Sequence, residues 1–144
     1  MAVSRHARET HRFDKKSLRL VMGKTADWAE LAAACVCFAN ASGGHLHIGI
    51  EDDAQQPPAG QRIDPELLDL IRRRVGERTV NVQIAPAIET ADNGGEFIAL
   101  AVARAVGVAS TSDGRYFLRV GDCCRPVVGD DVLQLLSDRP ALPW

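Results

Sequence analysis

The sequence predicts an α+β domain in which two or three helices pack on a mostly antiparallel β-sheet. One observation is an apolar face at helical spacing, formed by Trp28, Leu31, Cys35 and Phe38. A second is the placing of Leu46, Ile48 and Ile50 at alternate positions, the period of a strand with one buried face. The third is the predicted order of elements, which is strand, helix, strand, helix, three strands and helix. This order favours a mostly antiparallel sheet with helices packed on it.

The first half of the chain contains the helix and the strand that organise the rest. Thr25 or Asp27 can cap the helix by accepting hydrogen bonds from its first free N–H groups. Gly43 and Gly44 end it, because glycine adopts positive φ at little cost. The expected elements are a short strand over 10–16, a loop or helical turn over 17–24, a helix over 26–40, a strand over 45–52 and a loop over 53–63.

The second half is expected to hold a longer helix, three strands and a short helix. Asp64 and Pro65 open the longer helix as its N-cap and first helical residue, and Gly76 marks its end. A hairpin turn is indicated by the run Asp92-Asn93-Gly94-Gly95. The other expected elements are a strand over 80–84, a central strand over 97–103, a loop over 105–114, a strand over 115–120 and a helix over 129–136.

Length and composition indicate one globular domain. The chain has 144 residues, of which 46% are hydrophobic and 25% charged. We expect a flexible basic N-terminus over 1–8, the domain over 9–138 and an extended tail over 139–144. No apolar run approaches the ~20 residues of a membrane helix, and the start of the chain lacks an apolar signal-peptide core. The sequence therefore favours a cytoplasmic protein that does not contact membranes.

The four cysteines fit that location. Cys35 and Cys37 lie in the predicted apolar helix, and no C-x-x-C pair of the kind that binds zinc is present. Because disulfides are rare in the cytoplasm, we expect all four thiols to be reduced. His45 and His47 share one face of a strand, but no third ligand is evident, so we do not expect a metal pair there.

The net charge of −2 conceals an uneven distribution. Residues 1–24 hold seven basic and two acidic residues, whereas the rest of the chain is acidic overall. A basic segment can contact an anion such as a nucleic-acid phosphate, and it can equally be a solvated tail. The run Arg72-Arg73-Arg74 has the same two interpretations, as a phosphate contact or as a solvated helix face.

The central block of the sequence resembles the signature of the Schlafen/AlbA-like domain family. The block reads Ala39-Asn40-x-x-Gly43-Gly44-x-Leu46-x-Ile48-Gly49-Ile50-x-Asp52. The looser matches on either side are Glu9, Asp14-Lys15-Lys16, Tyr116, Arg119 and Gly121. The resemblance runs from about residue 9 to residue 136, and it implies that the chain has the Schlafen/AlbA-like fold.

The resemblance also implies a catalytic centre. In nuclease members of the family three acidic residues at these places cut RNA, and their counterparts here are Glu9, Asp14 and Asp52, with Lys16 beside them. Asp14 stands where the family usually has Glu, and the shorter side chain moves the carboxylate. Three carboxylates suit Mg²⁺ or Mn²⁺, and Lys16 would stabilise the extra charge of the transition state. Without the resemblance, Glu9 and Asp14 would be interpreted as solvated charges and Asp52 as a turn residue.

We therefore expect a metal-dependent endoribonuclease of the Schlafen type that acts on structured RNA such as tRNA, in defence or stress response. The alternative is a catalytically inactive module that binds DNA or RNA within a regulator, and a third interpretation is an interaction domain whose acidic cluster is incidental. The residues expected to contact nucleic acid are Arg12, Lys15, Lys16, Arg72, Arg73, Arg74 and Arg119.

Recognition of nucleic acid would use the backbone and its shape, since only 5% of the residues are aromatic and no stacking platform is evident. Vertebrate Schlafen proteins place two copies of this fold side by side in one chain. The resemblance therefore implies that this single copy is a homodimer or a domain within a larger assembly.

Overall fold

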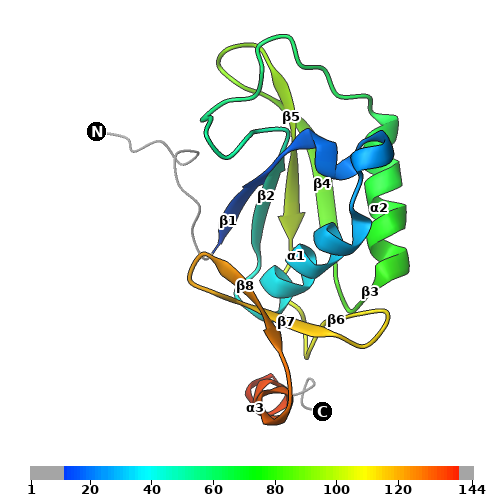
Figure 1. The fold of residues 1–144 in the computed structure, drawn as a ribbon, viewed down its shortest axis with the longest axis vertical. Helices are drawn as coiled ribbons and strands as arrows, with labels where there is room; N and C mark the ends of the chain where they lie inside the picture. Colours follow the sequence, from blue (N-terminus) through cyan, green and yellow to red (C-terminus); the bar gives the residue numbers. More distant parts are fainter. Residues whose placement is uncertain (1–11, 140–144) are drawn as a thin grey trace.

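The computed structural model describes residues 12–139. Glu9, the segment predicted over 1–8 and all but the first residue of the tail predicted over 139–144 lie outside the described residues. The main sheet has four strands in the order β1-β2-β5-β4 (Figure 1). These strands are β1 (Phe13–Lys16), β2 (Gly44–Ile48), β4 (Ile84–Thr90) and β5 (Glu96–Val102). β1 pairs parallel with β2, and the other two pairings are antiparallel. The α+β class with a mostly antiparallel sheet is confirmed, and so is the central place of β5.

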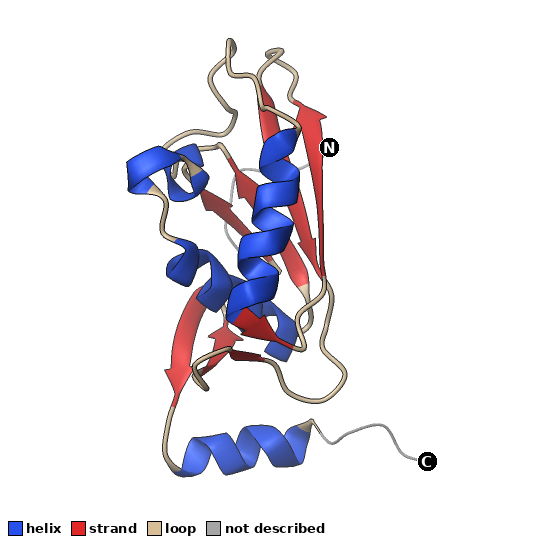
Figure 2. Cartoon of the chain, turned by 90° about the vertical axis from the view of Figure 1, so that its right-hand side faces the viewer, coloured by secondary structure: helices blue, strands red, loops and turns tan. Residues whose placement is uncertain are grey.

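Two helices, α1 (Trp28–Asn40) and α2 (Glu66–Arg78), cover one face of this sheet (Figures 1 and 2). The short helices η1 (Leu18–Val21) and η2 (Gly23–Thr25) lead from β1 into α1, whose N-cap is Asp27. The main core is formed between the helices and the sheet, with fully buried side chains that include Leu31, Phe38, Leu46, Ile48, Ile71, Ile98 and Leu100. Within residues 12–139, no helix combines the length and the apolar character that crossing a membrane requires.

The C-terminal part adds two small sheets and a third helix. β3 (Thr79–Val80) pairs with β6 (Ser110–Thr111), and β7 (Tyr116–Val120) pairs with β8 (Cys123–Val127). α3 (Asp130–Asp138) follows and lies at one end of the molecule, away from the main sheet (Figure 2). Neither β6 nor β8 was predicted. β8 is mostly exposed and contains a proline, so its sequence has no alternation of apolar and polar residues to reveal it.

Three predicted boundaries are wrong, and backbone conformation explains two of them. β2 ends at Ile48 and not at residue 52, because Gly49 adopts a φ of 116°. The strand expected over 80–84 is interrupted at Asn81, which has a φ of 64°, so its two ends belong to different sheets. α2 continues through Gly76, which has helical conformation in open space and does not end the helix.

Cys37 and Cys124 form a disulfide, with their Cα atoms 5.7 Å apart, and this bond joins α1 to β8. The expectation that all four thiols are reduced is therefore wrong for this pair. The fold brings together two cysteines that are distant in the sequence, and no spacing pattern in the sequence predicts such a pair. Cys35 and Cys123 are free thiols. Burial raises the pKa of the Cys35 thiol to about 12, whereas Cys123 is exposed.

Candidate functional site

Asp14 lies inside the domain, although it belongs to the edge strand β1. It pairs in register with Leu46, a core residue of β2, and its side chain is only 8% exposed. One carboxylate oxygen accepts a hydrogen bond from the backbone N–H of Lys15 at 2.8 Å. The other oxygen lies 3.6 Å from Lys16 Nζ and 3.6 Å from the Arg119 guanidinium. The negative charge of Asp14 is therefore neutralised by two cations of the domain itself.

Arg119 joins three elements of the fold. Its side chain is 2% exposed, and its guanidinium carbon lies 4.6 Å from the centre of the Phe38 ring, a cation–π contact. It also donates a hydrogen bond to the backbone carbonyl of Phe13 at 3.2 Å. β7 is thus fixed to both β1 and α1. A contact between Arg119 and nucleic acid stays a prediction, but in this structure the guanidinium faces the protein interior.

Lys15 ties the loop after β2 to β1. It is 4% exposed, and its ammonium group donates hydrogen bonds to the backbone carbonyls of Asp52 at 3.2 Å and Ala54 at 2.7 Å. The pairing of β1 with β2 brings the Asp52 turn beside β1. Asp52 itself is exposed. Lys15, which was expected to contact phosphate, is instead engaged inside the domain.

The expected metal-binding triad is described only in part, because Glu9 lies outside the described residues. Within residues 12–139, no group of three or more His, Cys, Asp and Glu side chains lies close enough together to hold a metal ion. Mg²⁺ and Mn²⁺ need several oxygen ligands, and both oxygens of Asp14 already have partners in the domain. The described donors therefore do not fit such an ion by themselves.

Two residues of the central block hold the fold together. The Asn40 side chain is buried at the end of α1, where it donates to the carbonyls of Ala109 and Phe117 and accepts from the Ala109 N–H at 2.7 Å. Gly44 is needed for space, because a Cβ atom there would lie 2.4 Å from the Phe38 ring. Their presence in the motif is therefore explained by packing and needs no ligand.

The arginines of α2 are exposed to solvent or half-buried. Arg72 pairs with Asp69 at 2.8 Å and Arg74 pairs with Glu77 at 3.2 Å, both within the helix. These pairs are the arrangement of a solvated helix face, and they offset part of the positive charge that a phosphate contact would use. Arg73 has no such pair within the described residues.

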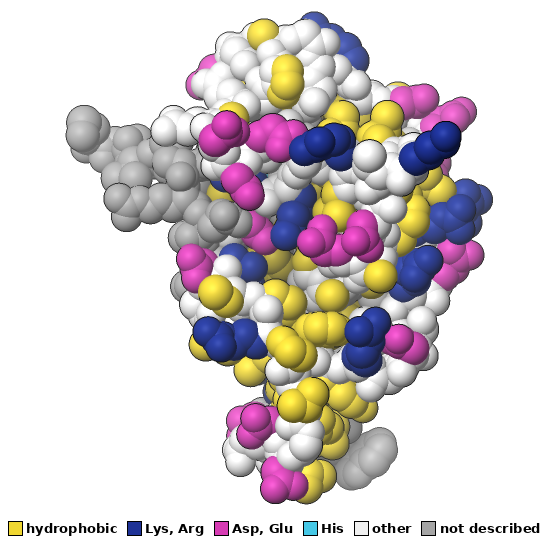
Figure 3. Space-filling model, in the orientation of Figure 1, with side chains coloured by type: hydrophobic (Ala, Val, Ile, Leu, Met, Phe, Trp, Pro, Cys, Tyr) yellow, Lys and Arg dark blue, Asp and Glu magenta, His cyan; other side chains and the backbone are white. Residues whose placement is uncertain are grey.

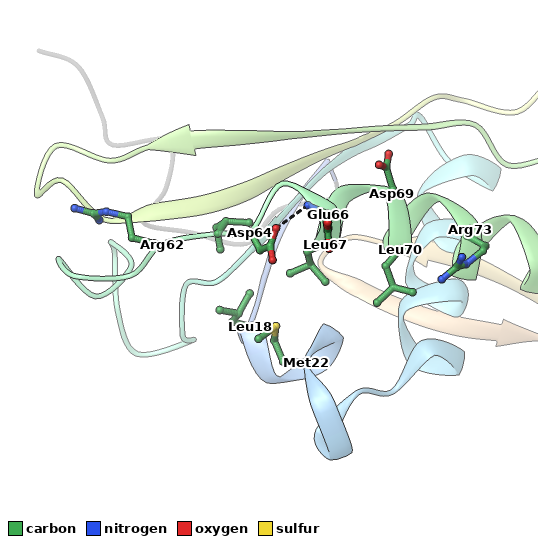
Figure 4. Close-up of a pocket in the computed structure, with 10 residues that line it drawn as sticks. Leu18, Met22, Arg62, Asp64, Glu66, Leu67, Asp69, Leu70 and Arg73 are labelled. Carbon is green, nitrogen blue, oxygen red and sulfur yellow. Dashed lines mark hydrogen bonds between the residues drawn. The ribbon is translucent and has the colours of Figure 1, made fainter.

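A groove of about 660 Å³ lies between η1 and α2 (Figure 4). Leu18, Met22, Leu67 and Leu70 form its apolar part, while Asp69 and Arg73 stand at its rim. At the start of α2, the Asp64 carboxylate accepts a hydrogen bond from the Glu66 N–H, and the Asp64 carbonyl accepts one from the Leu67 N–H. The groove has no set of converging polar groups of the kind that catalysis needs.

Sequence reasoning missed the pairing of Arg119 with Asp14, although one signal was present. Phe117 and Arg119 are two residues apart on β7, so they share a face, and Phe117 packs against the main core. An arginine on the apolar face of a strand needs a buried acidic partner, and a motif aspartate is the natural candidate.

The comparisons with known proteins agree with this fold. The family model described as "Schlafen, AlbA_2" matches residues 9–128. Among solved structures, the DIP2311 protein of Corynebacterium diphtheriae is similar, with a TM-score of 0.59 and 29% sequence identity over 81% of this chain. The match covers 25% of DIP2311, so this chain spans about a quarter of that protein's length. A search of curated proteins found no match. Because the family model covers most of the sequence, this protein belongs to the Schlafen AlbA_2 domain family.

Proposed function

We propose that this domain binds nucleic acid without cleaving it, as a module that serves a longer protein. The observation that carries this proposal is the state of Asp14, the residue at the family's second acidic position. Its carboxylate is 8% exposed and is neutralised by Arg119 and Lys16. An acid in that state stabilises the packing of β7 on β1 and is poorly available to a metal ion or a substrate.

Two further observations support a binding module. Within residues 12–139, the side chains that could bind Mg²⁺ or Mn²⁺ do not form a complete site, whereas binding of a nucleic-acid backbone needs only cationic side chains. The match to DIP2311 covers 25% of that chain, which fits a domain that occurs within larger proteins. RNA is the favoured partner, because this sequence resembles the family's signature and the nuclease members of that family act on RNA.

A metal-dependent endoribonuclease acting on structured RNA such as tRNA is the second candidate, and one observation favours it. The parallel pairing of β1 with β2 brings the Asp14-Lys15-Lys16 segment beside the turn that contains Asp52, and Lys15 bonds directly to the Asp52 carbonyl. Two of the three expected acids therefore come from neighbouring segments, and Asp52 is exposed. Lys16, with a side chain 27% exposed, would face the substrate from the same edge.

One experiment separates the two candidates. The protein and its Asp52→Asn variant are incubated with a tRNA pool, with Mn²⁺ or with a chelator, and both binding and fragments are measured. The binding-module proposal expects a shifted complex and intact RNA in every condition. Discrete fragments that require Mn²⁺ and disappear in Asp52→Asn would replace it with the nuclease. A protein that binds neither RNA nor DNA would leave an interaction domain as the remaining interpretation.

The expected homodimer stays a prediction that can be tested on the same sample. A two-fold dimer would present one surface patch to its own copy. We expect twice the mass of the single chain at tens of micromolar, measured by light scattering after size exclusion. A monomeric mass at that concentration contradicts the dimer and leaves the larger assembly as the source of a second copy.

A further inference from the structure

On the face of the main sheet opposite the helices, one row near the glycine turn holds two alanines and a histidine. The register places His45 beside Ala101 and Ala101 beside Ala85, so these three residues form one row across β2, β5 and β4. Ala85 and His45 are exposed, and Ala101 is half-buried. Because neighbouring strands are about 4.8 Å apart, the row is about 10 Å wide from β2 to β4. The two alanines therefore form a shallow floor beside the exposed His45 side chain.

A groove of about 880 Å³ lies at this end of the sheet face, and its lining is basic. Arg12 stands before β1, His45 lies in β2 and Arg104 follows β5, while the glycine turn after α1 completes the lining. No aspartate or glutamate is among the lining residues that the structure describes. The grooves beside α2 and beside α1, by contrast, both include carboxylates. On the helix-covered face, Lys and Arg side chains are interspersed with Asp and Glu (Figure 3).

Arg104 is the lining residue that most strongly favours binding of an anion in the groove. It is exposed, and among residues 12–139 it has no hydrogen bond or ion pair. A second arginine lies close enough for repulsion: the pKa of Arg139 is lowered first by burial and then by the charge of Arg104. Arg139 donates to four backbone carbonyls and to no carboxylate within the described residues. Within residues 12–139 no carboxylate compensates the positive charge of Arg104 and Arg139, and an anion would relieve it.

We propose that this groove binds the sugar-phosphate backbone of a single nucleic-acid strand. Arg12 and Arg104 supply charge complementarity to phosphodiesters, the His45 side chain can donate a hydrogen bond to them, and the two alanines let a strand approach the sheet closely. We expect one strand to lie along the floor between β2 and β4, which is about 10 Å across. Among the described residues the lining has no Phe, Tyr or Trp side chain on which bases would stack, so we expect binding that is independent of base sequence.

This inference rests on the proposed function and adds the surface that performs it. It also separates two candidate surfaces. The arginines of α2 were expected to contact phosphate, but Arg72 and Arg74 are already paired with carboxylates of their own helix. Arg104 and His45 were not expected to contact nucleic acid, because neither belongs to a basic run and the fold alone brings them together with Arg12.

The test measures binding of fluorescently labelled oligonucleotides by anisotropy at several salt concentrations. The probes are a single-stranded RNA of mixed sequence, the DNA of the same sequence, and a duplex of each. The variants are Arg104→Ala, His45→Ala and the double variant. The matched control is Arg115→Ala, an exposed arginine that pairs with Asp113, and Arg73→Ala tests the competing surface on α2. Circular dichroism and thermal melting verify that each variant is folded.

We expect Arg104→Ala to weaken single-strand binding about threefold to tenfold and to reduce the slope of log K against log salt by roughly 0.7, the loss of one phosphate contact. Arg115→Ala binds as the wild type does, and single strands bind more tightly than duplexes. Similar affinities for RNA and DNA identify the phosphodiester as the shared ligand. A preference for one of them identifies which nucleic acid the groove binds.

Two results overturn the inference in different ways. If the wild type binds single strands and the double variant binds them equally well, the groove is wrong and the proposed function stands. If the wild type binds no nucleic acid at all, the proposed function fails and the groove fails with it. Loss of binding in Arg73→Ala but not in Arg104→Ala would assign the contact to α2.

Discussion

The guanidinium of Arg119 lies 3.6 Å from the carboxylate of Asp14, and the two side chains are 2% and 8% exposed. This contact connects the C-terminal hairpin to the first strand of the main sheet. It gives a structural reason for an acid at position 14 and a basic residue at position 119. The two positions are the family's second acid and the arginine of its C-terminal motif, so part of the motif is accounted for by stability alone.

We predict that Arg119→Ala lowers the free energy of unfolding by about 3 kcal/mol or more. The substitution leaves the buried Asp14 carboxylate with one fewer cation and removes the contact with the Phe38 ring. Urea unfolding followed by circular dichroism measures the change. Arg119→Lys keeps the charge but not the planar group, and we expect it to recover only part of the loss.

The matched control is Arg115→Ala, close to the same hairpin. Arg115 pairs with Asp113 at 3.3 Å, but both side chains are more than half exposed, at 65% and 61%. Exposed pairs contribute about 0–1 kcal/mol, so this variant is expected to unfold close to the wild type. Equal losses in the two arginine variants would show that burial of the Asp14 pair has no special effect.

A second prediction concerns Asn40. We expect Asn40→Ala to lower the free energy of unfolding by about 2 kcal/mol or more, since it leaves the N–H and C=O of Ala109 and the carbonyl of Phe117 without their side-chain partner. Nucleic-acid affinity per folded molecule is expected to be unchanged. A variant that is as stable as the wild type but no longer binds would make Asn40 a ligand contact instead.

A third prediction concerns the cysteines, measured by iodoacetamide labelling and mass spectrometry. In the folded, non-reduced protein, Cys123 is modified because it is exposed. Cys35 is modified only after unfolding, because it is buried and its raised pKa keeps it a thiol. Cys37 and Cys124 are modified only after reduction. Labelling of all four cysteines in the non-reduced, unfolded chain would contradict the disulfide.

The Cys35 thiol also gives a pH dependence of stability. Its pKa is raised from 9.0 to about 12 by burial, so the stability that the neutral thiol contributes is complete below about pH 9 and is lost as the pH rises toward 12. We expect the stability difference between the Cys123→Ser protein and its Cys35→Ala derivative to shrink as the pH rises from about 9 to about 11. The Cys123→Ser background prevents disulfide exchange. A difference that stays constant over this range would mean that Cys35 is accessible to water.

The periodicity of apolar residues predicted the helices and strands whose sequences carry a regular apolar pattern. α1, β2 and β5 were predicted because each has a long apolar pattern. β8 could not be predicted, since its residues are mostly exposed and carry no pattern. The same limit applies to the site. The motif indicated Asp14, but the burial of Asp14, its pairing with Arg119 and the joining of Cys37 to Cys124 are tertiary contacts without local signals.

The last prediction compares two glycines that the sequence treats alike. Both Gly44 and Gly76 were expected to end helices, yet Gly44 begins β2 and Gly76 lies within α2. A Cβ atom at Gly44 would lie 2.4 Å from the Phe38 ring and 2.7 Å from the carbonyl oxygen of Arg12, whereas one at Gly76 would meet nothing within 4 Å. Gly44→Ala therefore forces β2 away from α1, and we expect a loss of about 1–3 kcal/mol in unfolding free energy. Gly76→Ala is expected to gain about 0.4–1 kcal/mol, because alanine restricts the unfolded chain and suits a helix. Urea unfolding of both variants checks the opposite signs of the two changes in unfolding free energy.

Because Gly44 also lines the basic groove, Gly44→Ala is expected to weaken single-strand binding as well, while Gly76→Ala leaves it unchanged. Stabilisation by both substitutions would mean that the close packing of β2 on Phe38 is absent in solution.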